Sequence, residues 1–334
     1  MNTLKTLNAI NAINTINTMS LLGVLSQGMA LVTALLLAPL LTGWVHQCRA
    51  WLHNKSGPGV LQPYRLLHKL FNKDLLMAEH ASALYRTAPY VVFSCTLLAS
   101  AIVPTLSTDL PLSPAADAIA LVGLFALARV FISLAAMDVG TAFGSLGARR
   151  EMLVGFLAVP ALLMVLFCAS MLTRSTSLTA IVETLAHRDL AIYPSMLLAC
   201  VAFTMVALAE NARVPVDNPD THLELTMIHE ALILEYSARH LALMEWAASL
   251  KLFAYAGIGL ALFCPWGVAE ADAPLALLLA LPVLVIKLAA VGALVALIET
   301  LSAKMRIFRV PEFLGTAFLL AVIGLLVNVL LGVA

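Results

Sequence analysis

The sequence predicts an all-α polytopic membrane protein with about eight transmembrane helices, and two observations carry this prediction. Of the 334 residues, 62% are apolar and only 11% are charged, whereas soluble chains are about half apolar and a quarter charged. A helix needs roughly 20 apolar residues to cross a bilayer, and eight runs have about that length. They lie near residues 20–44, 88–106, 114–137, 147–171, 190–210, 241–265, 274–299 and 311–332.

Residues 1–19 precede the first apolar run and are interpreted as a tail or an amphipathic extension. The segment repeats Asn, Thr, Ile and Leu, has Lys5 as its one charged residue, and contains no cleavage site typical of a signal peptide. No soluble domain fits between the later runs, so residues 20–334 are expected to form a single transmembrane domain.

The basic residues are unevenly divided between the two sides of the expected bundle. The connections after the first, third, fifth and seventh runs hold thirteen Lys and Arg residues, whereas the opposite side holds only Lys5, Arg174 and Arg188. Because cytoplasmic loops collect Lys and Arg, we expect the long connections to face the cytoplasm and both termini to face outward.

The first long connection, residues 45–87, contains an expected amphipathic helix. A Gly-Pro-Gly turn at residues 57–59 precedes a helix that continues to about Phe71. A helix held in the membrane interface by anionic headgroups is favoured on residue types alone, and a gate over an internal cavity is the alternative. The expected basic face carries Arg65, Lys69 and Lys73, and the expected apolar face carries Leu66, Leu67, Leu70 and Phe71.

The second long connection, residues 211–240, is acidic. Glu224 and Glu235 are 11 residues apart, which is about three helical turns and places them on one face of a continuous helix. Thr221 and Glu224 also fit a capping box, so spacing alone leaves a capping role and a proton-relay role for Glu224 equally open. The acidic residues in and beside this connection are Glu210, Asp217, Asp220, Glu224, Glu230 and Glu235.

Composition and spacing exclude several classes of function. Because 19 Lys and Arg residues match 19 Asp and Glu residues, nucleic-acid binding driven by phosphate neutralisation is excluded. The five cysteines stand singly, without a C-x-x-C pair for zinc or an iron-sulfur cluster. His222 and His229 would lie roughly 10 Å apart along a helix, too far to share an ion. We therefore expect no metal site in this chain.

Several ionisable residues fall inside the apolar runs or at their ends. Each costs roughly 2.5 to 3.5 kcal/mol to insert into a bilayer, and mutual pairing lowers this cost and allows proton exchange. A proton conduit and static contacts between helices both fit this pattern. The deep residues are Arg129, Lys251 and Lys287, and those near the ends, where side chains reach the headgroups, are Asp138, Glu151 and Glu299.

Six ordered motifs between residues 49 and 237 carry a family resemblance. They are RAWLHNKSGPGVLQPYR at 49–65, ARVF at 128–131, DVGTAF at 138–143, GARRE at 147–151, ENARVPVD at 210–217 and LEYS at 234–237. Together they resemble the NuoH/complex I subunit 1 family, and within it the membrane subunit of hydrogenase-4 and formate hydrogenlyase. The order of the six motifs makes the resemblance specific.

The resemblance implies an eight-helix, non-catalytic subunit in the cytoplasmic membrane of a bacterium or archaeon. Hydrogenase large and small subunits and a ferredoxin-like subunit would dock on it, beside antiporter-like membrane subunits and lipid. The nickel-iron centre and the iron-sulfur clusters would lie in those partners. This chain would supply the docking surface and the start of a charged axis for proton or sodium translocation.

Roles carry over to the residues that match the family motifs, and the resemblance favours a relay role for Glu224 and Glu235 over capping. The acidic loop matches at Glu210, Arg213, Asp217, Glu224 and Glu235, and the loop before the fourth run at Arg150 and Glu151. The relay or coupling candidates are Glu210, Asp217, Glu224, Glu235, Lys251, Lys287, Glu299, Glu151, Arg129 and Asp138, and the arm-docking candidates are Arg65, Lys69, Arg150 and Arg213.

Three departures separate the chain from quinone-reducing relatives. Val159, beside Pro160, stands where those relatives often have a carboxylate. The acidic loop is a few residues longer between Asp217 and Glu224, and the Gly-Pro-Gly turn is shorter. The last two features favour the hydrogenase branch over the rival interpretation, a quinone-reducing complex I subunit, under which a quinone would bind.

Two further functions compete from other classes. A secondary transporter would show inverted repeats with paired broken helices, and the sequence has no convincing internal repeat. A purely structural anchor would use the buried charges for assembly alone.

Overall fold

The computed structural model describes residues 2–77, 81–108, 111–112, 116–187, 194–217, 227–268 and 274–330, with the backbone alone for 2–22 and 274–278. Eight long helices coincide with the eight apolar runs: α1 (Asn2–Leu52), α3 (Ala83–Ile102), α4 (Ala118–Asp138), α5 (Ala142–Thr173), α7 (Pro194–Glu210), α9 (Ala238–Phe263), α10 (Pro274–Leu301) and α11 (Val310–Leu330). Among the described residues, six helical stretches are long and apolar enough to span a membrane, and α7 is a shorter apolar helix. The prediction of an all-α polytopic membrane protein is confirmed.

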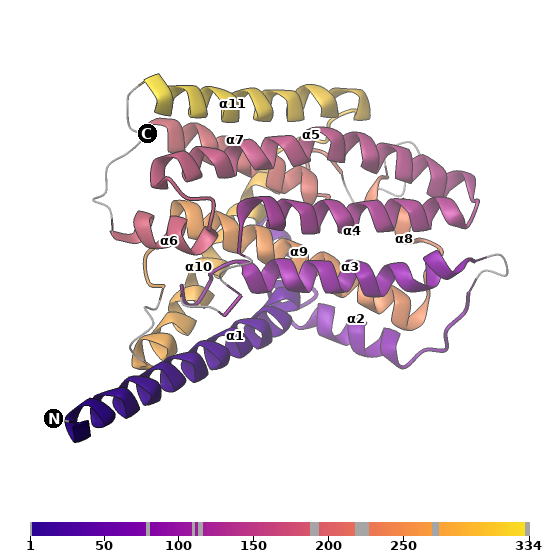
Figure 1. The fold of residues 1–334 in the computed structure, drawn as a ribbon. Coiled ribbons are helices and arrows are strands. Elements are labelled where there is room, and N and C mark those ends of the chain that lie inside the picture. The colour runs from indigo at the N-terminus through magenta and orange to yellow at the C-terminus, as the bar shows by residue number, and fades with distance from the viewer. Residues whose placement is uncertain are drawn as a thin grey trace.

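The expected tail is not separate from the first helix. The backbone is helical from Asn2 to Leu52, so residues 2–19 extend α1 away from the bundle (Figure 1). Two short helices, α6 (Leu178–His187) and α8 (His229–Ile233), were not expected from the apolar runs.

The prediction of one continuous helix across the acidic loop is wrong. α8 has only 5 residues and ends at Ile233, and residues 227–228 before it are not helical. Glu235 therefore lies in the link between α8 and α9, beyond the helix. Glu224 lies outside the described residues.

The amphipathic helix is confirmed as α2 (Gln62–Phe71). Leu67 and Leu70 are buried against Ala242 of α9, while Arg65 and Lys69 are exposed. The expected basic face is one residue too long, because the backbone leaves the helical conformation at Asn72 and Lys73 follows it. Leu66 and Phe71, expected on the apolar face, are exposed.

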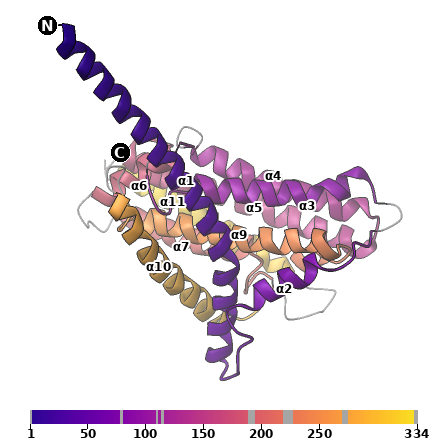
Figure 2. The same cartoon turned by 90° about the horizontal axis from the view of Figure 1, so that it is seen from below.

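The helix α9 lies at the centre of the bundle. Of its apolar span, 72% is buried, compared with 22% for α10 and 28% for α11. It packs against α1, α2 and α3, while α5 packs against α4, α7 and α11. Figure 2 shows α1 and α10 at a steep angle to these helices and close together toward their C-terminal ends. The Trp44 indole of α1 donates a hydrogen bond to Ala289 O of α10 at 2.9 Å.

The short helices α2 and α8 lie at the same end of the bundle, beside the start of α3 and the end of α4 (Figure 1). The described part of α11 ends at the opposite end, toward which α1 begins. The two long connections therefore meet on one side, and hydrogen bonds join them: Leu76 N donates to Ser237 Oγ at 3.0 Å, and Ser237 Oγ donates to Leu76 O at 2.5 Å.

Candidate functional site

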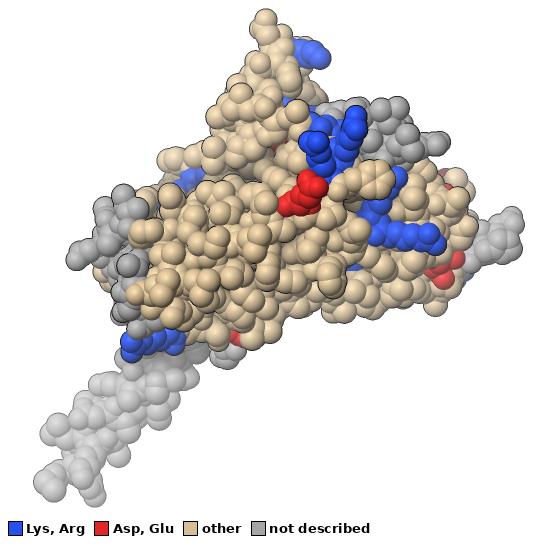
Figure 3. Space-filling view, turned by 90° about the horizontal axis from the view of Figure 1, so that it is seen from above, with Lys and Arg blue, Asp and Glu red and all other residues tan. Residues whose placement is uncertain are grey.

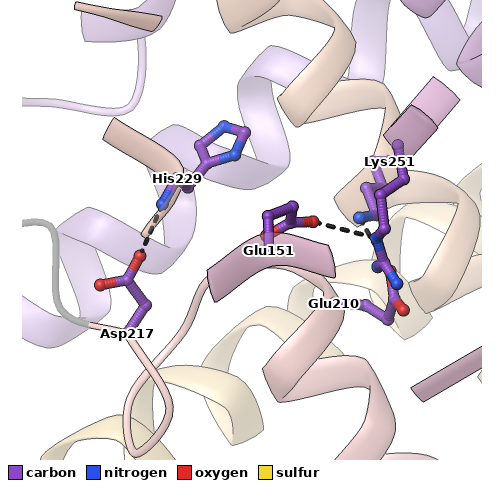
Figure 4. Close-up of polar contacts among 6 residues, drawn as sticks. Glu151, Glu210, Asp217, His229 and Lys251 are labelled. Carbon is purple, nitrogen blue, oxygen red and sulfur yellow. Dashed lines mark hydrogen bonds and ion pairs between the residues drawn. The ribbon is translucent and has the colours of Figure 1, made fainter. Parts of the chain in front are cut away.

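Four charged side chains from four helices meet inside the bundle. Arg129 of α4 donates from Nε to Glu151 Oε1 of α5 at 3.0 Å, and from Nη2 to Glu210 Oε2 at the end of α7. Lys251 Nζ of α9 lies 2.9 Å from the same Glu210 oxygen. Figure 4 shows Glu210 and Lys251 side by side with Glu151 pointing toward them. We call these residues the four-charge cluster.

The charges of the four-charge cluster cancel; Arg129 and Glu210 are buried, and Glu151 and Lys251 are half-buried. Arg129 is 7% exposed and Glu210 is 6% exposed. Taking single charges out of water costs several kcal/mol each, and removing one partner of a buried pair costs about 3–5 kcal/mol. Two cations and two carboxylates within ion-pair distance limit that cost, so the arrangement is stable only while the pairs stay matched.

Two glycines of α5 make room for this site. A Cβ at Gly155 would lie 2.3 Å from Arg129 Nη1, and a Cβ at Gly147 would lie 2.8 Å from the Cβ of Ala231 in α8. Gly155 thus admits the guanidinium and Gly147 admits α8. Arg129 Nη1 is buried and has no hydrogen-bond partner among the described residues.

Asp217 lies beside the four-charge cluster and fixes the start of α8. Its side chain is buried, and Oδ2 accepts hydrogen bonds from Ile228 N at 3.3 Å and His229 N at 3.0 Å. Arg150 of α5 donates from Nη1 to Met227 O at 2.9 Å. These contacts hold the backbone that carries His229 (Figure 4).

The His229 side chain borders a pocket that it shares with Arg129, Glu151 and Lys251. The pocket has a volume of about 40 Å³, enough for at least one water molecule. Burial lowers the pKa of His229 from its ordinary value, Lys251 lowers it further, and Glu151 and Asp217 oppose the shift. Sequence reasoning considered His229 only as a metal ligand and missed this position, because no local pattern reports proximity to Glu151 or Lys251.

A second ion-pair group lies between the ends of α7, α10 and α1. Arg213 donates from Nη1 to Glu299 Oε1 at 3.1 Å, and Arg49 Nη1 lies 3.9 Å from Glu299 Oε2. Glu299 is 6% exposed, so it does not reach the headgroups as its position near a helix end suggested. Lys304 lies near Asp217, and burial lowers its pKa although the Asp217 carboxylate opposes the shift.

The other candidate relay residues lie apart from the four-charge cluster. Asp138 Oδ2 accepts from Ser82 N at 3.0 Å, which ties the end of α4 to the start of α3. Lys287 donates to Cys264 O at 2.8 Å and to Trp266 O, at the end of α9. Glu235 is exposed. Of these, Asp138 and Lys287 are held by main-chain groups.

The docking candidates divide into two kinds. Arg65 and Lys69 are exposed on α2, whereas Arg150 and Arg213 point into the protein and bind Met227 O and Glu299. Figure 3 shows a mostly uncharged face of the molecule on which Lys and Arg side chains gather mainly in the right half of the view.

The position of Val159 is apolar. Its side chain packs against the largest cluster of buried residues in the described chain. Among the described residues, no group of three or more His, Cys, Asp and Glu side chains is placed to hold a metal ion.

The chain is similar to known proteins over most of its length. The profile of the family described as NADH dehydrogenase matches residues 26–330. The chain is 33% identical to formate hydrogenlyase subunit 4 of Escherichia coli (strain K12), over 86% of this chain and 94% of that protein. It is 32% identical to hydrogenase-4 component C of the same organism, over 88% and 92%.

The fold matches a solved structure as well. A chain in the membrane-bound sulfane sulfur reductase, an archaeal respiratory membrane complex, superposes with a TM-score of 0.77 at 21% identity, over 91% of this chain and 98% of that chain. At this identity the likeness concerns the fold alone.

Proposed function

Because the chain belongs to the NADH dehydrogenase (NuoH-type) family, we propose that it is the non-catalytic membrane subunit of an energy-converting nickel-iron hydrogenase or formate hydrogenlyase-type complex. Support comes from the two relatives, which are a formate hydrogenlyase subunit and a hydrogenase-4 component and align over most of their length. Hydrogen chemistry, the nickel-iron centre and the iron-sulfur clusters belong to partner subunits in this proposal.

The single observation that carries the coupling role is the four-charge cluster. Ionisable groups inside a bilayer are expensive and tend to mark ion or proton pathways. Here four of them, from α4, α5, α7 and α9, are linked by three successive ion pairs. When a nearby ion or electron changes the local electric field, the ion pairs of a charge-balanced cluster can rearrange, because one ion pair lengthens as another shortens. Such a response couples electron transfer in a docked arm to proton or sodium movement.

The docking role is assigned to the end of the bundle that carries α2 and α8. There α2 packs Leu67 and Leu70 on α9 and leaves Arg65 and Lys69 exposed. An acidic surface of a peripheral hydrogenase arm fits these cations, and electrostatic complementarity fixes orientation more than affinity. In this proposal that end faces the cytoplasm of a bacterium or archaeon, antiporter-like subunits lie alongside, and both termini face outward.

The test uses the whole complex reconstituted in proteoliposomes. We expect Glu210→Gln to abolish ion translocation while hydrogen or formate turnover and subunit assembly persist, because the Gln side chain keeps its shape and loses the charge shared by Arg129 and Lys251. Glu312→Gln, at an exposed carboxylate of α11 that is not among the relay candidates, is the matched control and should leave translocation unchanged. Equal translocation in both variants would refute the coupling role.

One observation favours the quinone-reducing alternative. An apolar cavity of about 210 Å³ lies among α1, α7, α9 and α10, with Asn211 and Arg213 at its border. Ligand pockets are lined mostly by apolar side chains, and an isoprenoid tail suits the apolar wall of this cavity. Quinone-dependent, inhibitor-sensitive turnover of the purified complex would decide for this alternative.

A further inference from the structure

The imidazole of His229 is placed at the border between the loops and the four-charge cluster. Its backbone N–H is held by Asp217, and its side chain borders the pocket shared with Glu151 and Lys251. Neither ring nitrogen has a hydrogen-bond partner among the described residues. His229 is half-buried, so water can reach its ring nitrogens and supply the hydrogen bonds that the described side chains do not.

Charged groups surround His229 on several sides. Lys251 of α9 and Arg129 of α4 line the same pocket as cations, and Glu151 of α5 lines it as a carboxylate. Asp217 adds a second carboxylate from the loop that leads to α8. On α3, Thr96 also borders the pocket, but its hydroxyl donates to the carbonyls of its own helix. The charge on His229 therefore depends on the state of the cluster.

The four members of the cluster are all engaged in ion pairs. A proton that reaches them from the loops has to arrive on a group that gains and loses it readily at neutral pH, and imidazole is the side chain suited to this. Among the described residues that line the pocket, His229 is the one titratable group outside an ion pair.

We propose that His229 passes protons between the loops and the four-charge cluster, through water in the pocket that it shares with Glu151 and Lys251. The inference rests on the proposed coupling function and adds the residue through which protons arrive. In each transfer one ring nitrogen takes a proton from hydronium on the loop side, which leaves water there, and the ring then gives a proton to water in the pocket, which becomes hydronium. The ring returns to its neutral form, and one positive charge has moved with the proton. Asp217 is a positioning residue, because it acts through the backbone of His229.

The electrostatic link is tested on the chain in lipid nanodiscs by NMR of labelled histidines, of which there are eight. His229→Gln identifies the resonance of His229, and exposed His68 is the matched control. Removing a nearby cation favours the protonated ring and removing an anion disfavours it. We expect Lys251→Met to raise the titration midpoint of His229 by about half a pH unit or more and Glu151→Gln to lower it, with His68 unchanged. If the titration midpoint of His229 is the same in both variants as in the unsubstituted protein, the proposal is overturned.

The transport role is tested in the reconstituted complex. We expect His229→Gln to slow ion translocation several-fold at unchanged hydrogen or formate turnover, and the slowing to be greatest where uptake of protons limits the rate, at high pH. The substitution leaves the backbone hydrogen bond to Asp217 in place, so folding is expected to persist.

The two proposals fail differently. If Glu210→Gln stops translocation and His229→Gln has no effect, the coupling function stands and the role of His229 is refuted. If neither substitution changes translocation, both proposals are refuted. A loss in His229→Gln that is equal at all pH values and accompanied by loss of assembly would also refute a proton-transfer role.

Discussion

Two sets of charged residues lie in or next to the helical bundle, and they are stabilised in different ways. In the four-charge cluster, charges from four helices pair with one another. At the bundle ends, Asp138 and Lys287 instead bind main-chain groups of Ser82, Cys264 and Trp266. The first set links several helices through charge, whereas the second fastens helix termini. Position inside an apolar run therefore does not by itself mark a residue as part of a conduit.

The largest expected effect distinguishes these two sets by stability. Arg129→Met removes the common partner of the buried Glu210 and the half-buried Glu151, and we expect it to lower the free energy of unfolding by about 3–5 kcal/mol. Unfolding of the purified protein in detergent, followed by circular dichroism, measures it. Arg65→Met, on the exposed face of α2, serves as the control and should stay within about 0.5 kcal/mol. An Arg129→Met variant as stable as that control would contradict the burial and pairing of the cluster.

The space beside Arg129 gives a second test. Gly155→Ala places a Cβ 2.3 Å from Arg129 Nη1, and we expect a loss of about 1–3 kcal/mol from the forced shift. Gly123→Ala in α4 is the matched control, since a Cβ there meets no atom within 4 Å. Its higher helix propensity should stabilise the protein by up to about 1 kcal/mol. Equal melting temperatures for the two variants would contradict the claim that Gly155 makes room for the guanidinium of Arg129.

The anchoring of α8 gives a third, more local effect. Asp217→Ala removes the acceptor of the amide groups of Ile228 and His229, and we expect a cost of about 1–3 kcal/mol. Hydrogen exchange should increase at residues 227–233 and remain unchanged in α11. If the substitution changed the exchange rates of residues 227–233 and of α11 by the same factor, Asp217 would not be what holds this loop.

The smallest effect is expected at the bundle end. Asp138→Ala removes one hydrogen bond to Ser82 N, worth about 0.5–1.5 kcal/mol, and should leave ion translocation unchanged. A translocation defect without a stability change would move Asp138 from the second set to the first.

The sequence predicted the positions of the helices far better than it predicted which of their charged side chains contact one another. The eight apolar runs coincide with the eight long helices, because a helix that spans a bilayer must satisfy its own backbone and needs a fixed apolar length. The same reasoning marked Arg129, Lys251 and Lys287 as deep, yet only the first two join the cluster. Rotation and crossing of α9 and α10 decide this, and no local pattern encodes them.

Loop structure was the least predictable part. An 11-residue spacing suggested one helical face for Glu224 and Glu235, but α8 has only 5 residues. Its start is determined by Asp217, ten or more residues earlier in the chain. Arg150 and Arg213 were assigned to an outer docking face, and the structure turns both toward internal partners. Tertiary contacts, not charge or spacing, set these conformations.

The most direct test of the account uses a variant that removes one anion and one cation together. Glu210→Gln/Lys251→Met keeps the cluster neutral and leaves the Arg129 to Glu151 pair, so the complex should assemble with normal redox turnover. The number of ions moved per electron pair in proteoliposomes is the measurement. We expect it to fall to zero. An unchanged ratio would contradict the claim that this buried cluster carries the coupling.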